Sequence, residues 1–458
     1  MSEPTTTQSV QFPDLFGKPL VARFDLPHAS SDGGAVLLKA ADRRLRLVDR
    51  LSRCLRDERE PGKVRHEISE LLAQRMFGIA CGYSDANDAA RLSDDPIHKL
   101  LLGRDPVHGD SLPSQPTLSR FENAAGAREL YRMGETLFDI VVERHKKRLG
   151  SNVQRITLDL DPTDDPTHGA QQLSFFNGFY DCWCYLPVLG FLTFNGEKDE
   201  YLCAALLRPG NATPMLGTLA LLKRILDRLQ HTFSRARILV RLDGGFACPE
   251  IFHFLDGVGV DYVVAMAKNS VLKGLAADLM DEAGQLSEQS GQTEKLYSEC
   301  SYRAGKWDRE RRVIFKAEVV RHPGREPKDN PRFVVTNLKG SPKRIYEKIY
   351  CGRGEIENRI KELHDGLDLG RTSCTSFFAN QLRVLLTAGA YVLMQEVRLK
   401  AAHTRYARAQ VSTIREHLLK IGAWIEVSVR RIVLHLPKAY PFRAEWNSLA
   451  LALGAQAG

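Results

Sequence analysis

The chain has 458 residues, enough for two or three compact cores of ordinary size. Lys and Arg number 64 against 56 Asp and Glu, and the net charge of +8 suits a polyanionic partner such as nucleic acid. The nine cysteines are scattered without a C-x-x-C pair, which argues against a disulfide framework and favours the reducing cytosol.

The sequence predicts neither export nor membrane insertion. Residues Met1 to Val10 are polar and carry neither the basic start nor the apolar core of a signal peptide. The longest apolar stretch, Leu382 to Val397, contains charged residues and is shorter than the roughly 20 residues that a membrane span needs. We therefore expect a buried core helix there and no membrane contact.

The first 150 residues are expected to be mainly helical. Apolar residues recur at helical spacing over His66 to Gly78 and over Leu130 to Val142. Ser114 is a plausible cap of another helix, which leaves Thr117 and Arg120 on an exposed face. This face could meet DNA, or it could belong to an ordinary capped surface helix.

From Arg155 to Asp161 the pattern alternates with period two, which predicts a strand. Two further strand-like runs, Trp183 to Phe194 and Tyr201 to Leu207, are separated by the hairpin-turn signal Asn195-Gly196. At the start of this region, Cys182-Trp-Cys184 places two thiols on one face of a strand. No second ligand pair is visible, so packing is favoured over zinc binding.

A helix and a fourth strand follow. Pro214 to Leu229 is amphipathic, and the apolar run Ile238 to Leu242 is closed by Asp243-Gly-Gly245. Three strands, a helix and a fourth strand, with acids at the ends of the first and fourth, form the element order of an α/β, RNase H-like core, a mixed sheet flanked by helices.

An insertion then interrupts the core. After a strand at Tyr262 to Ala267, further strands are expected at Leu296 to Tyr302, Arg312 to Val320 and Pro331 to Asn337. These runs predict a mostly β insertion between Lys273 and Lys339, before the helix that carries Glu357.

That helix carries a pattern of its own. Tyr350, Arg353, Glu357 and His364 stand at offsets 0, +3, +7 and +14, which return to one face of a 3.6-residue helix, and Lys361 borders the same face. The face could line a groove, or it could be a solvated charged surface held by ion pairs.

Three acidic residues form the candidate catalytic group. Asp161 and Asp243 each end an apolar strand, where a carboxylate must be solvated or held by a cation. With Glu357 they could hold two Mg²⁺ ions about 3.5–4 Å apart, with Mn²⁺ as a substitute. The competitors for the first position are Asp159, Asp164 and Asp165. Asp161 is preferred because it closes the strand directly before Pro162-Thr163.

Several motifs together resemble a known family. They are Asp159-Leu-Asp161-Pro-Thr-Asp-Asp-Pro-Thr-His-Gly169, Arg241-Leu-Asp243-Gly-Gly-Phe246, Tyr350-Cys-Gly-Arg353-Gly-Glu-Ile-Glu357-Asn-Arg-Ile-Lys361, Gly82-Tyr-Ser-Asp-Ala-Asn-Asp88 and Gln115-Pro-Thr-Leu-Ser-Arg-Phe-Glu-Asn123. The chain resembles DDE transposases of bacterial insertion sequences, in the group marked by Y-x2-R-x3-E-x6-K. It is most similar to the insertion-sequence family designated thirteen-eighty.

The resemblance implies roles for single residues. Asp161, Asp243 and Glu357 would be the metal-binding triad, and Tyr350 and Arg353 would contact phosphates at the cleaved end. The lysine expected seven residues after the glutamate is His364 here, so either Lys361 substitutes for it or strand-end handling is weaker. Relatives stack an aromatic side chain of the insertion on a flipped base. Trp307 is the candidate for that stack, with packing of the insertion as the alternative.

The resemblance also implies an overall function and organisation. It predicts a cut-and-paste DNA transposase of the bacterial cytoplasm, associated with the nucleoid, that binds inverted-repeat ends and target DNA as at least a dimer. The alternatives are an RNase H-like nuclease without strand transfer and an inactive DNA-binding regulator. The predicted segments are a helical DNA-binding region (1–150), the core in two parts (151–270 and 343–400), the β-rich insertion (271–342) and a C-terminal helical and strand region (401–458).

Overall fold

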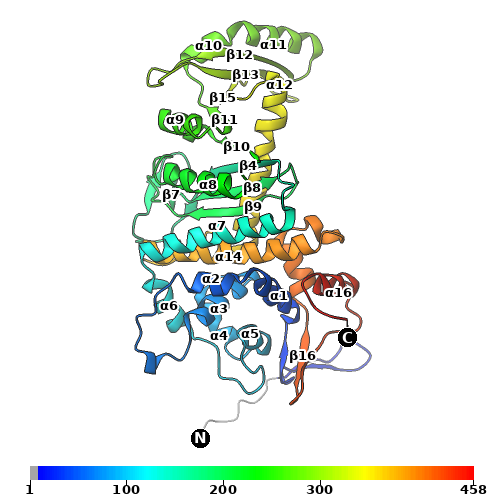
Figure 1. The fold of residues 1–458 in the computed structure, drawn as a ribbon. Coiled ribbons are helices and arrows are strands. Elements are labelled where there is room, and N and C mark those ends of the chain that lie inside the picture. Colours follow the sequence, from blue (N-terminus) through cyan, green and yellow to red (C-terminus); the bar gives the residue numbers. More distant parts are fainter. Residues whose placement is uncertain (1–8, 458) are drawn as a thin grey trace. The chain divides into compact units, whose positions relative to one another are not determined.

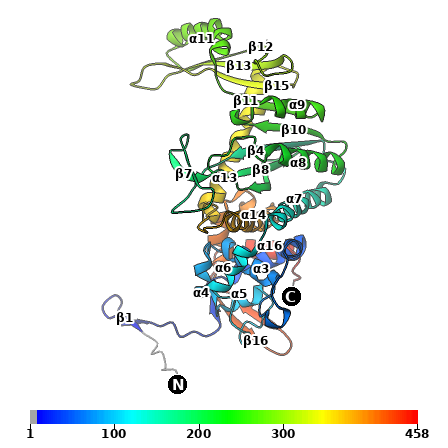
Figure 2. The same ribbon diagram turned by 90° about the vertical axis from the view of Figure 1, so that its left-hand side faces the viewer.

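The computed structural model describes residues 9–457, and the first eight residues of the polar N-terminal segment Met1 to Val10 lie outside that range. The chain divides into two compact units. The sheet unit comprises residues 45–58 and 122–395 (Figures 1 and 2). The terminal unit comprises residues up to 44, 59–121 and 396 onward. The sheet unit carries all of the candidate catalytic residues.

A mixed sheet forms the centre of the sheet unit. Its strand order is β12-β13-β15-β11-β10-β4-β8-β9, and β14 pairs with β13. The strands are β4 (Arg155–Pro162), β8 (Val188–Phe194), β9 (Tyr201–Leu206), β10 (Arg237–Leu242), β11 (Asp261–Met266), β12 (Glu294–Tyr302), β13 (Arg311–Val320), β14 (Lys328–Asp329) and β15 (Arg332–Thr336). Strand β10 runs parallel to both β4 and β11, whereas the other pairings are antiparallel. The structure confirms a mixed α/β architecture.

Helices cover both faces of this sheet. Figure 2 shows α8 and α9 on one side and α13 on the other. The helices of the sheet unit are α2 (Leu47–Ser52), α7 (Ala127–Leu149), α8 (Thr218–Thr232), α9 (Pro249–Gly257), α10 (Ser270–Leu275), α11 (Ala277–Ser290), α12 (Pro342–Arg344), α13 (Gly354–Leu367) and most of α14 (Phe377–Lys400). Because the central strand β4 is covered on both faces, Asp159 is as fully buried as the apolar Leu158 and Leu160.

The edge strand β9 is closed by side chains rather than by another strand. Gln395 of α14 accepts from the Leu202 amide at 3.2 Å and donates to the Glu200 carbonyl at 2.7 Å. Gln381 accepts from the Leu207 amide at 2.7 Å. These amide groups satisfy backbone positions that an open sheet edge would expose. Figure 1 shows α7 and α14 along this edge.

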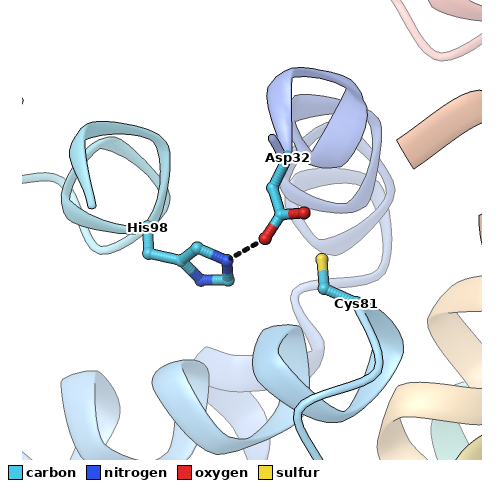
Figure 3. Close-up of side chains that lie close together, drawn as sticks. All are labelled: Asp32, Cys81 and His98. Atoms are coloured by element: carbon cyan, nitrogen blue, oxygen red, sulfur yellow. Dashed lines mark hydrogen bonds and ion pairs between the residues drawn. The ribbon is translucent and has the colours of Figure 1, made fainter. Parts of the chain in front are cut away.

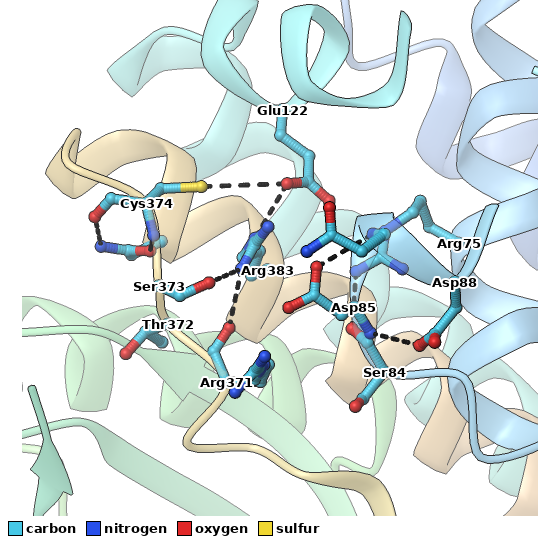
Figure 4. A network of polar contacts seen from close by, with 12 residues as sticks. Arg75, Ser84, Asp85, Asp88, Glu122, Arg371, Thr372, Ser373, Cys374 and Arg383 are labelled. Carbon is cyan, nitrogen blue, oxygen red and sulfur yellow. Dashed lines mark hydrogen bonds and ion pairs between the residues drawn. The ribbon is translucent and has the colours of Figure 1, made fainter. Parts of the chain in front are cut away.

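Helix α14 is the apolar stretch that the sequence assigns to the core. Among the described residues it is the one helix long and apolar enough to cross a membrane, yet 83% of its apolar window is buried inside the protein. Arg383, one of the charged residues that interrupt it, donates to Glu122 at 2.8 Å and to the Ser373 hydroxyl at 2.6 Å (Figure 4). The buried charge therefore has partners, as expected for a core helix.

The insertion differs from the prediction of a mostly β segment. Its first part is helical, over α10 and α11, and only then do its strands begin. Strand β15 pairs with β11, so the insertion extends the central sheet instead of forming a separate one. Val334 of the insertion shares an apolar cluster with Leu239 and Val263 of the core strands. The sequence pattern missed the helices because a charged, turn-rich stretch hides their apolar face.

The predicted strand from Trp183 to Phe194 is also wrong, since it divides in two. Strand β7 (Cys182–Tyr185) belongs to a small separate sheet with β5 (Asp165–Pro166) and β6 (Phe175–Asn177), and β8 begins only at Val188. The break falls at Pro187, which cannot donate a backbone hydrogen bond. We call residues 175–185, the strands β6 and β7 with their turn, the aromatic hairpin.

The terminal unit gathers both ends of the chain. Its elements are β1 (Val10–Phe12), β2 (Leu20–Ala22), β3 (Ala29–Ser30), α1 (Val36–Leu45), α3 (Ile68–Ala80), α4 (Ala89–Leu92), α5 (Pro96–Leu101), α6 (Gln115–Ala124), α15 (Val411–Ile414), β16 (Ala423–Val427), β17 (Ile432–His435) and α16 (Arg443–Ala452), with α1 and α6 reaching past its boundary. Strand β16 pairs with β3, which joins the C-terminal segment to the N-terminal one. The division into units places α7, which belongs to the predicted segment 1–150, in the sheet unit, where it packs on β9.

Candidate active site

Two of the three candidate acids lie side by side at one end of the sheet. Strands β4 and β10 are parallel and in register, with Leu160 opposite Leu242. The next residues are Asp161 on β4 and Asp243 directly after β10, so both carboxylates emerge at the same edge. The Asp243 side chain also accepts from the Gly245 amide at 3.0 Å, which fixes its direction. Strand pairing thus brings together two residues that are 82 positions apart in the chain.

The third acid reaches this edge from α13. Glu357 and Asp161 line the same cavity, of about 380 Å³, whose other walls come from the loop after β4, from Tyr180 and from α13. Ile356 and Ile360 of α13 are buried, which turns Glu357 outward toward the cavity. The structure brings the three predicted acids together.

The helical segment that carries Tyr350, Arg353 and Glu357 is less regular than a single α-helix. Residues Ile345–Tyr350 form a π-helical turn and Cys351–Arg353 a 3₁₀ turn before α13 begins at Gly354. Tyr350 and Arg353 therefore do not lie on the regular helix of Glu357. Arg353 still reaches Asp161, and π-helical turns of this kind occur often at functional sites.

The acids also interact electrostatically. Burial raises the pKa of Asp161 to about 7; the Arg353 guanidinium opposes this, and the negative charges of Asp243 and Glu357 add to it. Burial also raises the pKa of Asp243, against the charge of Arg353. Since the acids repel one another across this cleft, a cation bound there would relieve the repulsion.

Arg353 holds the acids from within the protein. Its guanidinium donates to Asp161, and both side chains are almost buried, at 12% and 13% exposed. Tyr350 lies nearby, and burial raises the pKa of its phenol, opposed by Arg353 and assisted by Asp243. The predicted phosphate-contacting residues are thus at the acids. In this structure Arg353 contacts a carboxylate.

A buried ion pair beneath the site decides between the aspartates of β4. Arg241 donates to both oxygens of Asp159, at 2.7 and 2.6 Å, and Asp159 is fully buried. Arg241 also donates to the Ile349 carbonyl at 3.0 Å, and a Cβ at Gly352 would lie 2.7 Å from its guanidinium. Asp159 therefore serves as an anchor for the irregular turns before α13, and Asp161 remains the available acid.

The two later competitors for the first metal position occupy different places. Asp165 is fully buried and accepts from the Thr372 hydroxyl at 2.8 Å, which ties β5 to the segment after α13. Asp164 lines the cavity of Asp161 and Glu357. The preference for Asp161 rests on its register beside Asp243, which neither competitor has.

Lys361 and His364 both line the cavity, as their spacing from Glu357 predicts. Lys361 is exposed on α13, whereas His364 is partly buried and its Nε2 lies 3.3 Å from the Thr163 hydroxyl. Burial lowers the pKa of His364, and the nearby Asp164 and Asp365 oppose this effect only in part. His364 is therefore neutral near pH 7, and Lys361 is the cation of this wall.

Trp307 does not fit the base-stacking role implied for it. The side chain is 4% exposed and packs against Phe252 at 5.2 Å and Tyr302 at 5.6 Å between ring centroids. Arg311 lies over the ring as well, at 6.0 Å. With these neighbours the indole has no free face for a base. The alternative interpretation, packing of the insertion, describes its contacts.

Sequence reasoning missed the aromatic hairpin, whose Tyr180 lines the acid cavity. The signal was present as aromatic density, with Phe175, Phe176, Phe179, Tyr180 and Trp183 within a short segment. The sequence pattern instead places Trp183 at the start of a long strand. Pro187 was the residue that should have broken that strand.

The three acids fit a pair of magnesium ions. Mg²⁺ prefers oxygen ligands and takes few carboxylates, with water and phosphate supplying the rest. The acids do not form a single-ion cluster, since among the described residues only Asp32, Cys81 and His98 have ligand atoms all within 4.8 Å of one another. Two ions about 3.5–4 Å apart do not require every carboxylate to be that close, because each ion is held by different oxygens.

The tighter group, in the terminal unit, is unsuited to magnesium. We call Asp32, Cys81, His98 and Lys420 the Asp32 cluster. His98 Nε2 lies 2.8 Å from Asp32 (Figure 3), and the Lys420 ammonium lies 2.7 Å from the other Asp32 oxygen. Burial raises the pKa of the Cys81 thiol, and a protonated thiol is a poor ligand for a hard cation. Asp32 already has its counterion.

These observations define an α/β protein in which two acids at the ends of parallel strands converge with a third acid on a helix. A family model for the transposase DDE domain, group 1, matches residues 12–456. The match covers nearly the whole chain, and the chain therefore belongs to this family of transposases. No curated protein sequence gives a match.

Proposed function

We propose that this chain cleaves DNA at the inverted-repeat ends of an insertion sequence and joins the freed 3′-hydroxyls to target DNA. The observation that carries the proposal is the meeting of Asp161, Asp243 and Glu357 at one edge of the sheet. The strand order β9-β8-β4-β10-β11, with parallel β4, β10 and β11, supports an RNase H-like core. The quoted motifs support membership of the thirteen-eighty group.

The proposed site has one fixed and one adaptable part. Asp161 and Asp243 stand on paired strands, so their spacing is set by backbone hydrogen bonds. Glu357 is exposed on α13, and it can adjust when a substrate binds. Bound Mg²⁺ ions would lower the pKa of the attacking water or hydroxyl and stabilise the leaving oxygen. The acids are the proposed ligands.

The cations around the acids are proposed to position the DNA backbone. Lys361 lines the cavity next to Glu357, where an exposed ammonium can contact a phosphate. Arg353 orients Asp161 through their ion pair, and its guanidinium suits a phosphate as well as a carboxylate. With His364 neutral, the positive charge of the usual lysine is missing, and Lys361 is the proposed substitute.

The decisive experiment compares cleavage and joining by matched variants. Labelled DNA carrying the ends of the encoding element is incubated with protein, a target plasmid and Mg²⁺ or Mn²⁺. Asp161→Asn is expected to abolish cleavage and to spare end binding. Glu355→Gln, on the exposed first turn of α13, is the control and should cleave normally. Retained cleavage by Asp161→Asn would refute the assignment.

The same reaction separates the alternatives. A nuclease without strand transfer would release cut ends and yield no joined product. An inactive regulator would bind the ends and leave them intact, and His364→Lys would then be the variant expected to restore cleavage. Paired ends imply at least a dimer in the active complex, which light scattering with and without end DNA tests.

A further inference from the structure

Exposed aromatic side chains gather on the aromatic hairpin, next to the acid cavity. Phe176 is 51% exposed, Trp183 59% and Phe179 88%. We call these three rings and Tyr180 the aromatic platform. Exposed rings are ordinary when single, but a contiguous group of them on a soluble protein marks a binding site. Figure 2 shows the hairpin, labelled β7, projecting from the sheet.

Strand register explains why these rings face outward together. Phe176 pairs with Trp183 across β6 and β7, and their ring centroids lie 6.4 Å apart. The flanking Cys182 and Cys184 point to the other face of the strand, and Cys184 is buried. The small sheet therefore buries Cys184 on one face and presents Phe176 and Trp183 to solvent on the other.

The turn of the hairpin connects this surface to the acids. The Asn177 side chain accepts from the amides of Phe179, at 3.0 Å, and Tyr180, at 3.3 Å, which shapes the turn. The Phe179 and Tyr180 rings are 4.9 Å apart. Tyr180 lines the same cavity as Asp161 and Glu357. The aromatic platform and the acid cavity therefore share a wall.

The residues that lead into the aromatic hairpin are anchored to the segment that follows α13. Gln171 donates to the Thr372 carbonyl and, at 3.0 Å, to that of Cys374. The Gln172 amide donates to the Thr375 carbonyl at 3.0 Å. This segment is held in turn by Arg383, which donates to Ser373 and Glu122. The platform is thus fixed relative to the helix of Glu357.

Charge points to nucleobases as the occupant of this surface. Between Gly169 and Cys184 the single charged residue is Asp181, so the hairpin offers no cation to a phosphate. Aromatic faces suit unpaired bases, which stack on them largely whatever their sequence, while nearby cations contact the backbone. The cation of the adjoining cavity is Lys361, placed to meet the backbone of the same strand.

We propose that the aromatic platform binds unpaired DNA bases beside the cleaved phosphodiester, with Trp183 and Phe176 as the stacking rings. The inference rests on the proposed function, because the acid cavity supplies the strand whose bases would stack. Stacking of this kind holds the strand end while the backbone lies at the acids. It assigns a positioning role to a hairpin outside the insertion.

The test measures binding without catalysis. A fluorescein-labelled single strand of about 12 thymidines and a blunt duplex of equal length are titrated in EDTA, with anisotropy as the readout. Trp183→Ala and Phe176→Ala should each weaken single-strand binding roughly tenfold or more, since one stacked base contributes that much. Duplex binding should change less than about twofold. Trp424→Ala, a half-exposed indole of the terminal unit, is the matched control and should bind like wild type.

Two further variants distinguish stacking from apolar docking. Trp183→Phe should retain most of the affinity for the thymidine strand, whereas Trp183→Leu should lose as much as Trp183→Ala. Equal binding by Trp183→Leu and wild type would overturn the proposal. Unchanged binding by both alanine variants would overturn it as well. A change in the oligomeric mass of these variants in light scattering would also overturn it, because the platform would then be an interface between copies.

Failure of this inference is separable from failure of the proposed function. The EDTA titration does not depend on metal, while the cleavage reaction of wild-type protein does. Metal-dependent cleavage together with normal single-strand binding by Trp183→Ala would overturn only the platform. Absence of cleavage by wild-type protein would overturn the proposed function itself.

Discussion

Asp32 in the terminal unit is fully buried and Asp161 in the sheet unit is partly buried at the wall of a cavity, and their surroundings are opposite. Burial by itself raises the pKa of Asp32, but hydrogen bonds from His98 and Lys420 outweigh it and hold the pKa below its usual value. Asp161 has one arginine and two further acids nearby, and burial raises its pKa to about 7. One site is neutralised by the protein, and the other keeps an excess of negative charge.

Proximity of ligand-type side chains does not by itself define a metal site. The Asp32 cluster is the tighter group, but Lys420 already supplies its cation. At the Asp161 site the arginine cannot neutralise three acids. A buried charge without a counterion costs stability, which a functional site can tolerate if a cation arrives with the substrate.

The largest effect should come from the acid that is least fixed. Glu357→Gln keeps the shape of the side chain but removes one negative charge from the site. We expect cleavage to fall roughly a thousandfold or more, because metal ions contribute several kcal/mol to such reactions and 1.4 kcal/mol is tenfold. Rates of end cleavage in Mg²⁺ measure this. Asp32→Asn, compared per folded molecule, should leave the cleavage rate within about threefold of wild type. An equal loss of rate in both variants would contradict the distinction between the two sites.

Stability should show the opposite ranking. Asp32→Asn removes the counterion of the partly buried Lys420 and leaves an uncharged group in the buried Asp32 position, which should lower the free energy of unfolding by about 3 kcal/mol. Asp161→Asn should change it by less than about 1 kcal/mol, since Asp243 still interacts with Arg353 and a repulsive charge is lost. Urea unfolding in EDTA gives both values. Asp32→Asn combined with Lys420→Met should recover part of the loss, and failure to recover would contradict the ion-pair explanation.

The pH dependence of stability should sharpen the difference. The folded pKa of Asp32 lies below its unfolded value near 3.8, so the folded state binds fewer protons there. Its contribution is fully present above that pH and is lost as the pH falls through the folded value. The stability gap between wild type and Asp32→Asn should therefore be constant from about pH 5 to 6 and shrink below about pH 4. A gap that widens on acidification would contradict the sign.

The smallest effect should follow from a cation added to the acid cavity. His364→Lys places a fixed positive charge beside the acids, where the histidine is neutral. End-DNA binding should strengthen severalfold, and the slope of log affinity against log salt should steepen by about one, as for one more phosphate contact. Anisotropy at several salt concentrations measures both. Arg120→Lys, which keeps the charge on the exposed face of α6, is the control. An unchanged slope would show that position 364 does not reach the backbone.

Parts of the fold and site followed directly from residue patterns. Alternation over Arg155 to Asp161 predicted β4, and the acids that end β4 and β10 predicted the site. The motif from Tyr350 to Lys361 placed Glu357 on its helix. The predictions of strand β4 and of the helix of Glu357 succeeded because strand alternation and helix spacing are local properties of the chain.

Other predictions failed where a distant partner decided the outcome. The helices α10 and α11 were missed, and Trp183 was assigned to a long strand that Pro187 divides. The sequence alone does not distinguish Trp307 from Trp183, yet Trp307 is covered by Phe252 and Trp183 faces solvent. Exposure depends on what packs against a side chain, which spacing along the chain does not encode.

The sequence by itself determined the three acids, the strand and helix that present them, and the transposase motifs. The tertiary structure alone decided that Arg241 removes Asp159 from consideration, that Lys420 neutralises Asp32, and that the aromatic hairpin borders the acid cavity. The physical reason is that charge pairing and burial arise between segments far apart in the chain, and folding selects those partners.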